Sequence, residues 1–367
     1  MNKKIVFAVT NDLTYDQRMQ KICRSLSHAG YTVELVGRER NTSLPLSNEP
    51  FKQTRLKCSF DKGKLFYVEY NFRLFLYLLS QKADAFCAID LDTIASVVSA
   101  AKIKRAKIAY DAHEYFTEVP EVIRRPKVKK VWQWVEKTFV PKVDLAYTVS
   151  PAIAELFSKQ YSKKFNVIMN VPVLAQRTSS MQPTNNNTAV ILYQGALNEG
   201  RGLEHLIETM HEVNAKLILA GEGDLSNALR LQVKQAGLEE KVEFAGFVKP
   251  EDLRKLTQDA SIGINLLENK GLSYYYSLSN KFFDYIHAGV PQVCINFPEY
   301  QQINEDYDVA VLVKDCSPQE IKKAIERLLN DKEFYARLQK KCEVCSTSLN
   351  WQNEEKKLVA FYHELLR

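Results

Sequence analysis

The stretch LSNKFFDYIHAGVPQVCI, residues 278–295, holds a lysine at a position that helices disfavour. Ser279 or Asn280 can cap a helix here, which puts Lys281 in its first turn. That end of a helix carries partial positive charge, so a lysine becomes favourable when an anion such as a diphosphate binds beside it. Asp284 follows, and its carboxylate can accept hydrogen bonds from two vicinal ribose hydroxyls. The pattern alone equally fits a polar-capped core helix.

A glycine-rich loop follows a predicted strand in LYQGALNEGRGLEHLI, residues 192–207. Gly195, Gly200 and Gly202 allow the backbone to approach a phosphate, and Arg201 at the start of the next helix can neutralise it. The spacing is neither that of a dinucleotide fingerprint nor that of a P-loop. An ordinary turn between a strand and a helix remains the alternative.

His113 lies in the polar segment KIAYDAHEYF, just after a predicted strand of the first half. It can bind a ligand hydroxyl or take part in proton transfer near neutral pH, and a satisfied interior histidine is the alternative. The segment NDLTYDQR is expected at the same edge, where Asp16 and Arg18 can contact an acceptor. Asp16 is equally explained as a helix N-cap and Arg18 as a solvated side chain.

No metal site is predicted. AIDLDT contains Asp90 and Asp92, but we interpret Asp92 as the N-cap of the helix that follows, and further oxygen ligands are not evident. Cys342 and Cys345 form a C-x-x-C pair without a second pair or a nearby histidine.

Residues 124–142, RRPKVKKVWQWVEKTFVPK, form a basic amphipathic stretch with seven Lys or Arg and one acidic residue. Its apolar positions recur at helical spacing, from Val128 through Val131, Trp132 and Val135 to Phe139. A basic amphipathic helix with tryptophan suits an anionic membrane surface. A helix that packs on its own domain through this stripe and exposes a solvated basic face fits equally well.

Short apolar runs alternate with helical patterns along the chain, as in a parallel α/β fold with doubly wound sheets. The predicted strands are residues 5–9, 32–36, 85–89, 107–111, 145–149 and 166–170, and then 189–195, 216–222, 242–247, 262–267 and 292–297. Two further helical segments are expected at 317–347 and 351–367. Ligands in such sheets bind at the carboxyl ends of the strands, so the residues named above lie where chemistry is expected.

The break in this rhythm predicts two domains. Residues 172–188 are rich in Pro, Ser, Thr and Asn and are interpreted as a linker between domains at 1–171 and 189–350. A cleft is expected between the two domains, and the last helix, 351–367, is expected to cross back to the first domain.

The composition favours a cytoplasmic globular protein. The 367 residues suffice for two cores, and the net charge of +6 is too mild to favour nucleic-acid binding. Seven scattered cysteines argue for a reducing compartment. The first apolar run, residues 5–9, is shorter than a signal sequence needs, and no run is long enough to span a bilayer.

Several ordered motifs resemble those of a known family. They are YDAHE, LAYTVSPAIAE, VIMNVP, YQGALNEGRGLEHLIETM, LILAGEG, VEFAGFVKPEDL and SNKFFDYIHAGVP. In this order the sequence resembles the retaining glycosyltransferases of family four (glycosyl transferases group one), which have the two-domain GT-B fold. The resemblance covers nearly the whole chain.

This resemblance implies roles for particular residues. Arg201 and Lys281 would contact the donor diphosphate with the backbone of Gly195, and Asp284 would bind the ribose. Ser279 and Asn280 would belong to the same donor site. Gly246, Phe247 and Val248 would line the base pocket. His113 would lie beside the donor sugar. No metal or other cofactor is implied, because positive side chains and helix ends stabilise the leaving diphosphate.

The family pattern is incomplete at two positions. Ala196 replaces a frequent arginine, and Tyr276 lies near the position of a family glutamate, which leaves the sugar-contacting loop 271–279 without that carboxylate. The resemblance implies transfer of a sugar from a nucleotide-sugar donor to a glycan or lipid-linked acceptor, for cell-surface polysaccharide. A sugar-nucleotide 2-epimerase of the same fold and a non-catalytic homologue that binds a partner are the alternatives.

Overall fold

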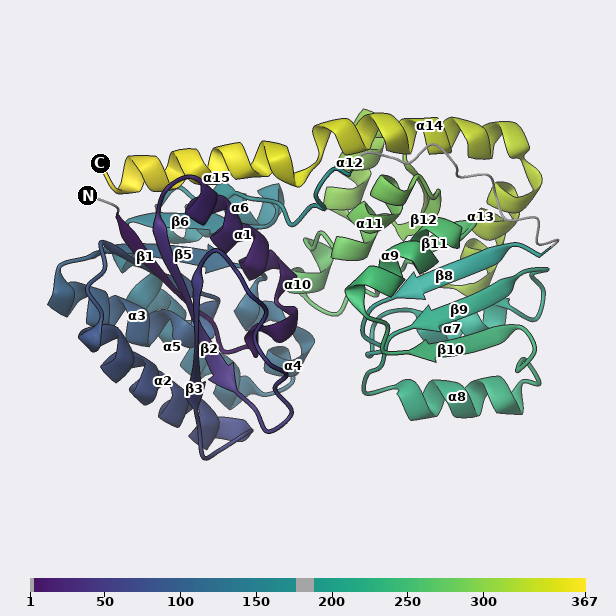
Figure 1. Ribbon diagram of the computed structural model, residues 1–367. Coiled ribbons are helices and arrows are strands. Elements are labelled where there is room, and N and C mark those ends of the chain that lie inside the picture. Colours follow the sequence, from purple (N-terminus) through teal and green to yellow (C-terminus); the bar gives the residue numbers. More distant parts are fainter. Residues whose placement is uncertain (1–2, 176–187) are drawn as a thin grey trace. The chain divides into compact units, whose positions relative to one another are not determined.

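The computed structural model describes residues 3–175 and 188–367. It divides into two compact units, Met1–Met169 with Glu354–Arg367 and Asn170–Asn353, which are described separately (Figure 1). Most of the predicted linker, residues 176–187, lies outside the described residues.

The first unit is built on a seven-stranded parallel sheet of order β3-β2-β1-β4-β5-β6-β7. Its strands are β1 Lys4–Ala8, β2 Thr32–Glu39, β3 Lys52–Lys57, β4 Ala85–Ile89, β5 Lys107–Ala112, β6 Leu145–Thr148 and β7 Asn166–Val167. The chain moves outward in one direction from β1 through β2 and β3, then in the other from β4 onward. Ligands bind at such a switch point, just beyond the carboxyl ends of β1 and β4.

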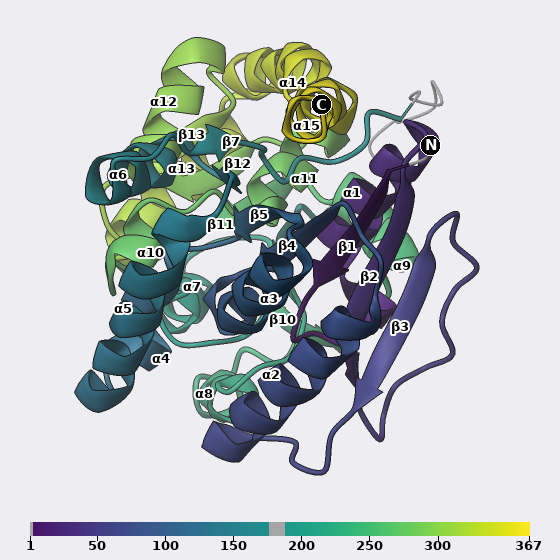
Figure 2. The same cartoon turned by 90° about the vertical axis from the view of Figure 1, so that its left-hand side faces the viewer.

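Helices cover both faces of this sheet, which explains why its central strands are apolar throughout. Helices α2 (Gly63–Ser80), α3 (Leu91–Lys104), α5 (Pro126–Phe139) and α6 (Pro151–Tyr161) lie on one face, and α1 (Gln17–His28) and α15 (Trp351–Leu365) on the other (Figure 2). A short α4, Pro120–Ile123, precedes α5.

The second unit repeats this design with a six-stranded parallel sheet of order β10-β9-β8-β11-β12-β13. The strands are β8 Val190–Gln194, β9 Lys216–Ala220, β10 Val242–Gly246, β11 Ile262–Asn265, β12 Gln292–Ile295 and β13 Ala310–Val313. The helices are α7 Leu203–Thr209, α8 Ser226–Gln235, α9 Pro250–Asp259, α10 Leu272–Tyr275, α11 Asn280–Ala288, α12 Pro298–Tyr307, α13 Pro318–Asn330 and α14 Lys332–Ser348. Here the switch point lies between β8 and β11. The predicted doubly wound α/β architecture is confirmed in both units.

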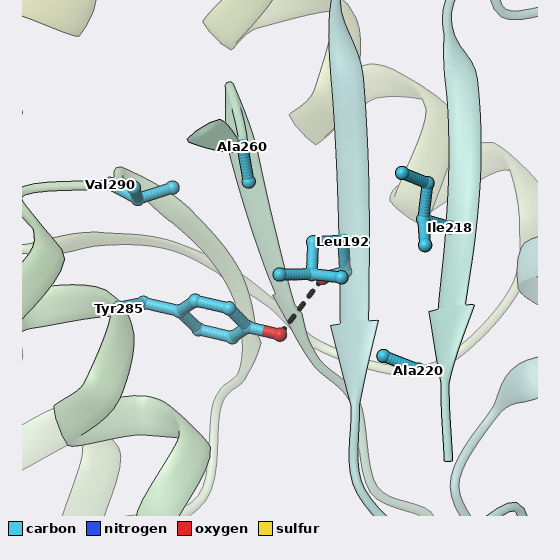
Figure 3. Packing of buried hydrophobic residues seen from close by; sticks show 6 residues of the cluster. All are labelled: Leu192, Ile218, Ala220, Ala260, Tyr285 and Val290. Carbon is cyan, nitrogen blue, oxygen red and sulfur yellow. Dashed lines mark hydrogen bonds between the residues drawn. The ribbon is translucent and has the colours of Figure 1, made fainter. Parts of the chain in front are cut away.

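Tyr285 fixes α11 on the sheet of the second unit. Its hydroxyl donates a hydrogen bond to the carbonyl oxygen of Leu192 at 2.9 Å (Figure 3). Its ring lies so close to Gly263 that any Cβ there would collide with it. The surrounding buried cluster consists of Leu192, Ile218, Ala220, Ala260, Tyr285 and Val290 (Figure 3). This packing sets the position of the whole of α11, including its first turn.

The structure adds elements that the sequence patterns missed. Strand β3 reads KQTRLK and β13 is only four residues long, so neither shows a long apolar run. The helical segment predicted at 317–347 is two helices, because Asp331 ends α13 and its side chain caps α14 by accepting a hydrogen bond from the amide of Phe334.

The last helix, α15 (Trp351–Leu365), contributes to the core of the first unit. Tyr362 is fully buried, its ring lies 5.8 Å from that of Phe7, and its hydroxyl is 3.1 Å from that of Tyr147. The side chain of Glu354 accepts a hydrogen bond from the amide of Met169 at 3.0 Å. Across the described ranges, no helix combines the length and the apolar character that crossing a bilayer requires.

Candidate active site

Lys281 is a buried cation in the first turn of α11, with 8% of its surface exposed. Its ammonium lies 4.1 Å from the centre of the Tyr193 ring. Ser279 is the N-cap residue, but its hydroxyl donates to Oδ1 of Asn265 at 2.7 Å and makes no cap hydrogen bond. Burial, and next the positive charge of Arg201, lower the pKa of Lys281 well below its usual value. In the free protein, burial and Arg201 therefore disfavour the charged form of Lys281.

Arg201 supplies the second positive charge from the loop that follows β8. Its guanidinium lies 4.8 Å from the centre of the Tyr274 ring. Its Nε atom is buried and has no hydrogen-bond partner within residues 3–175 and 188–367. In the same ranges no carboxylate lies within ion-pair distance of Arg201 or Lys281. Buried charges normally have partners, so this pair of cations is suited to an anion with two negative charges.

Glycines bring the backbone close to this pair of cations. Gly195 has a φ of +125°, and a Cβ added there would lie 3.8 Å from the Lys281 ammonium. A Cβ at Gly221 would collide with the carbonyl oxygen of Gly195. Gly221 requires glycine because the loops after β8 and β9 pack backbone to backbone there, and Gly195 favours glycine because of its positive φ. Next to them, the exposed Ala196 accepts a hydrogen bond from the Tyr193 hydroxyl through its carbonyl oxygen.

Asp284 lies half-buried in α11, within electrostatic reach of Lys281. Its Oδ2 accepts a hydrogen bond from Nε2 of Gln194 at 2.8 Å, and Thr257 in turn donates to Oε1 of Gln194 at 2.7 Å. This chain of hydrogen bonds orients the carboxylate. Asn280, also predicted in the site, is exposed, and its Oδ1 accepts a hydrogen bond from Asn170 at 2.8 Å.

The segment predicted as a base pocket follows β10, which lies two strands away from β8 in the sheet. Gly246 has a φ of +66°, which turns the chain at the end of the strand. Phe247 is 63% exposed, and Val248 packs against the cluster of Figure 3. Phe247 is therefore the residue of this segment whose ring is accessible to a ligand, and Val248 anchors the segment on the core.

The structure therefore brings Gly195, Arg201, Lys281 and Asp284 together beyond the carboxyl ends of β8 and β11. Their roles toward a ligand stay predictions. Tyr276, which lies near the position of the family glutamate, is half-buried. The centre of its ring is 4.9 Å from the centre of the Tyr275 ring.

In the first unit, His113 lies between two carboxylates at the ends of β4 and β5. Its Nε2 is 3.1 Å from Oδ2 of Asp111, and its Nδ1 is 3.6 Å from Oδ2 of Asp90. Burial alone would lower the pKa of His113, but Asp111 and Asp90 outweigh it and raise that pKa to about 9. Burial also raises the pKa of Asp90 to about 8, whereas the pKa of Asp111 is lowered, so Asp111 is the carboxylate that keeps the imidazole charged near neutral pH. A charged imidazole is a hydrogen-bond donor and a poor base.

Arg18 is not a solvated side chain, because only 5% of its surface is exposed. Its Nη2 donates to Oδ1 of Asp111 at 2.9 Å and its Nη1 to the carbonyl oxygen of Ile168 at 3.0 Å. This burial does not fit the predicted contact with an acceptor. Arg18 instead holds Asp111, which in turn holds His113. Asp16 caps α1 by accepting a hydrogen bond from the amide of Met19, as predicted in one of its two interpretations.

Asp90 was missed as a site residue, and Asp92 was wrongly interpreted as the N-cap. The N-cap of α3 is Asp90, with φ 56° and ψ 175°, a conformation that non-glycine residues adopt only at a cost of about 1–3 kcal/mol. Its Oδ1 accepts a hydrogen bond from the His113 amide at 2.8 Å. Asp92 is buried in the first turn and accepts a hydrogen bond from Thr10 at 2.6 Å. No sequence pattern reveals a strained aspartate, so only the structure identifies this one.

The basic stretch 124–142 contains α5, but its apolar stripe is only partly buried. Val135 is buried, and the Trp132 ring contacts those of Tyr67 and Phe116. Val131, which the helical spacing assigns to the packed stripe, is 59% exposed, and Trp134 is 63% exposed. Of the two interpretations of this stretch, a helix that packs through its whole stripe does not fit the exposure of Val131.

Comparison with known proteins finds a family match within the second half of the chain. Residues 176–343 match the family described as glycosyl transferases group 1, as the sequence motifs predicted. An uncharacterized glycosyltransferase from Methanocaldococcus jannaschii is 30% identical over 149 residues. That match covers 40% of this chain and only 37% of the length of that relative.

Solved structures share the fold over the whole chain. A sucrose-phosphate synthase from Thermosynechococcus elongatus has a TM-score of 0.80 at 16% identity and covers 99% of both chains. HepE of Anabaena, solved in complex with UDP and glucose, has a TM-score of 0.76 at 15% identity and covers 99% of this chain and 100% of its own. At these identities the likeness shows the fold alone, and the predicted GT-B class is confirmed.

The carboxylates around His113 make its titration a test of this cluster. We predict that Asp90→Asn lowers the pKa of His113 from about 9, because it removes one of the two charges that stabilise the imidazolium. The raised pKa stabilises the fold at low pH, and this contribution is lost as the pH rises through 9. NMR titration of the imidazole checks the prediction, with the exposed Glu121→Gln as the control. An unchanged midpoint in Asp90→Asn would contradict it.

Proposed function

We propose that this chain, whose residues 176–343 match the glycosyl transferases group 1 family, transfers a sugar from a nucleotide-diphosphate-sugar donor to an acceptor hydroxyl. One observation carries the proposal. The buried Lys281 and the half-buried Arg201 lie together without a carboxylate within ion-pair distance in the described chain, at the switch point of a doubly wound sheet. A diphosphate supplies the charge that this site lacks.

The donor is proposed to bind along the carboxyl edge of the second sheet. Lys281 and Arg201 hold the diphosphate, and the glycine backbone at Gly195 lets it approach closely. Asp284, oriented by Gln194, accepts hydrogen bonds from the ribose hydroxyls. Gly246 to Val248 line the base pocket. HepE has been solved with UDP and glucose, which makes uridine-diphosphate sugars the first donors to test.

The reaction is proposed to retain the anomeric configuration. The bond between the anomeric carbon and the diphosphate breaks as the acceptor oxygen bonds on the same face, and the acceptor proton passes to the leaving phosphate. Lys281 and Arg201 stabilise the charge that develops on the leaving group, so we propose that no metal ion is required. His113, which Asp111 and Asp90 hold, is proposed to lie beside a sugar hydroxyl.

We predict that Lys281→Met makes the free protein more stable but abolishes most of its nucleotide binding. The change removes a buried charge that burial and Arg201 disfavour, and with it a charge-assisted contact of about 1.5–3 kcal/mol, or roughly 10–100-fold in affinity. Thermal unfolding with and without nucleoside diphosphates and nucleotide sugars measures both effects. A ligand at about 100 times its dissociation constant adds about 2.7 kcal/mol to stability.

Lys255→Met, an exposed lysine of α9, is the matched control and should change neither quantity. If no nucleotide stabilises the unmodified protein, the donor proposal fails. Turnover of the donor without an acceptor would indicate a 2-epimerase. Binding without turnover against any acceptor would indicate the non-catalytic homologue, which Ala196 and Tyr276 favour.

The acceptor is proposed to be a glycan or lipid-linked sugar for cell-surface polysaccharide. The protein is then cytoplasmic and binds the inner face of the membrane through α5. Val131 and Trp134 are exposed on this helix, and the exposed Lys127 and Lys130 lie at neighbouring positions. Exposed tryptophan among lysines is the composition of a helix that lies in an anionic interface.

We predict that the protein sediments with vesicles that contain anionic phospholipid and not with neutral ones. Lys127→Gln with Lys130→Gln should weaken vesicle binding by roughly tenfold or more, since each lysine contributes about 1 kcal/mol at such a surface. The control is Lys340→Gln with Lys341→Gln, two exposed lysines of α14. Equal loss in both double variants, or equal binding to neutral vesicles, would rule out this surface.

A further inference from the structure

A tyrosine ring lies against each member of the cation pair, Lys281 and Arg201. The ammonium of Lys281 lies over the ring of Tyr193, 4.1 Å from the ring centre. The guanidinium carbon of Arg201 lies over the ring of Tyr274, 4.8 Å from its centre. A cation within about 6 Å of a ring centre is attracted by the negative face of the ring. Each cation thus has an aromatic partner, while no carboxylate of the described chain lies within ion-pair distance of it.

An aromatic partner differs from a carboxylate because it leaves the positive charge of the cation unneutralised. Tyr193 is fully buried, and burial raises the pKa of its hydroxyl above the usual tyrosine value, so the side chain is neutral near neutral pH. Its ring offsets part of the cost of burying Lys281 without forming an ion pair. The charge of Lys281 therefore stays available to a bound anion, with which a carboxylate at the same place would compete.

Contact with a ring also leaves the hydrogen-bond donors of Arg201 available. A guanidinium stacks on a ring through its face, and its N–H groups point outward in its own plane. The Nε atom of Arg201 is buried and has no hydrogen-bond partner within residues 3–175 and 188–367. Tyr274 can therefore hold Arg201 while the N–H groups of the guanidinium bind phosphate oxygens.

The segment that carries Tyr274 is fastened to the loop after β8. The amide of Glu268 donates a hydrogen bond to the carbonyl oxygen of Gly200 at 2.9 Å. The ammonium of Lys270 lies 2.8 Å from a carboxylate oxygen of Glu199 and 2.9 Å from one of Glu268. Gly200 has a φ of +79°, and a Cβ added there would lie 3.2 Å from Cε2 of Tyr274. The absence of a side chain at this glycine lets the ring approach the loop, next to the arginine that follows.

Tyr193 is held from the other side of the same loop. It lies in β8, one residue before the end of the strand, and its hydroxyl donates to the carbonyl oxygen of Ala196 at 2.8 Å. A Cβ added at Gly195 would lie 3.6 Å from Cε of Lys281 and 3.9 Å from the Tyr193 hydroxyl. The turn after β8 therefore fixes the ring against Lys281. Ala196, where the family has a frequent arginine, closes this turn through its backbone.

We propose that two tyrosines, Tyr193 and Tyr274, are positioning residues of the donor site. They hold the cation pair in place for the diphosphate of the donor without neutralising it. The inference rests on the proposed donor binding and adds two residues to which the sequence motifs assign no role. Because Tyr274 belongs to the loop 271–279, this loop also positions a phosphate-binding arginine.

The test at Tyr274 compares two variants of the full chain by titration calorimetry with uridine diphosphate and with inorganic pyrophosphate. Tyr274 is half-buried, so its variants are expected to fold. Tyr274→Leu removes the ring face and should weaken both ligands roughly threefold to tenfold. Tyr274→Phe keeps a ring and should bind both within about twofold of the unmodified chain. Pyrophosphate has neither base nor ribose, so an equal loss for both ligands assigns the effect to the diphosphate.

Tyr307→Leu, at a half-buried tyrosine of α12, is the matched control and should leave both affinities unchanged. Unchanged affinities in Tyr274→Leu would overturn the role of Tyr274. Equal losses in Tyr274→Leu and Tyr274→Phe would assign the effect to the hydroxyl and overturn the role of the ring.

A second measurement, on Tyr193, needs no nucleotide. Tyr193→Leu should lower the pKa of Lys281 in the free protein further, because the ring face that favours the ammonium is lost. Tyr193→Phe keeps a ring and should leave that pKa unchanged. NMR titration of the labelled lysine side chain measures both variants, and the same pKa in Tyr193→Leu and the unmodified chain would overturn the role of Tyr193. If no diphosphate binds the unmodified chain, the donor proposal fails, and this titration still decides whether the ring holds Lys281.

Discussion

Lys281 and Arg201 repel one another inside the second unit, and the surrounding structure holds them together regardless. Tyr285 fixes α11 through its hydrogen bond to Leu192, and Lys281 lies buried in the first turn of this helix. The backbone of Gly195, which packs against Gly221, lies beside the Lys281 ammonium. Folding thus stores an electrostatic cost at the switch point of the sheet, and an anion that binds there relieves it. This electrostatic cost favours ligand binding, because a bound anion offsets the repulsion between the two cations.

The first unit balances its buried charges internally. Around His113, the protein supplies its own counter-charges, Asp111 and Asp90, and Arg18 pairs with Asp111. The charges of this cluster are therefore balanced by the protein itself, whereas Lys281 and Arg201 have no carboxylate within ion-pair distance in the described chain.

The sequence predicted the fold where apolar runs are long and buried, and β4 has the expected bounds, residues 85–89. It failed for β3, whose charged residues at the sheet edge conceal a strand. In the second unit the sequence also identified Lys281 and Arg201, because local rules expose a lysine in a first turn and an arginine among glycines. It could not find the Arg18–Asp111 pair, whose members are 93 residues apart, or the positive φ of Asp90. Contacts between distant residues and backbone strain leave no local pattern.

The most direct measurement of the central claim is the pKa of the Lys281 ammonium, followed by NMR of the labelled side chain in the free protein and with a saturating nucleoside diphosphate. We expect a pKa well below the usual lysine value in the free protein, because of burial and Arg201, and a clear rise when the diphosphate binds. A lysine that titrates normally in the free protein, or whose pKa does not change on adding the diphosphate, would contradict the account.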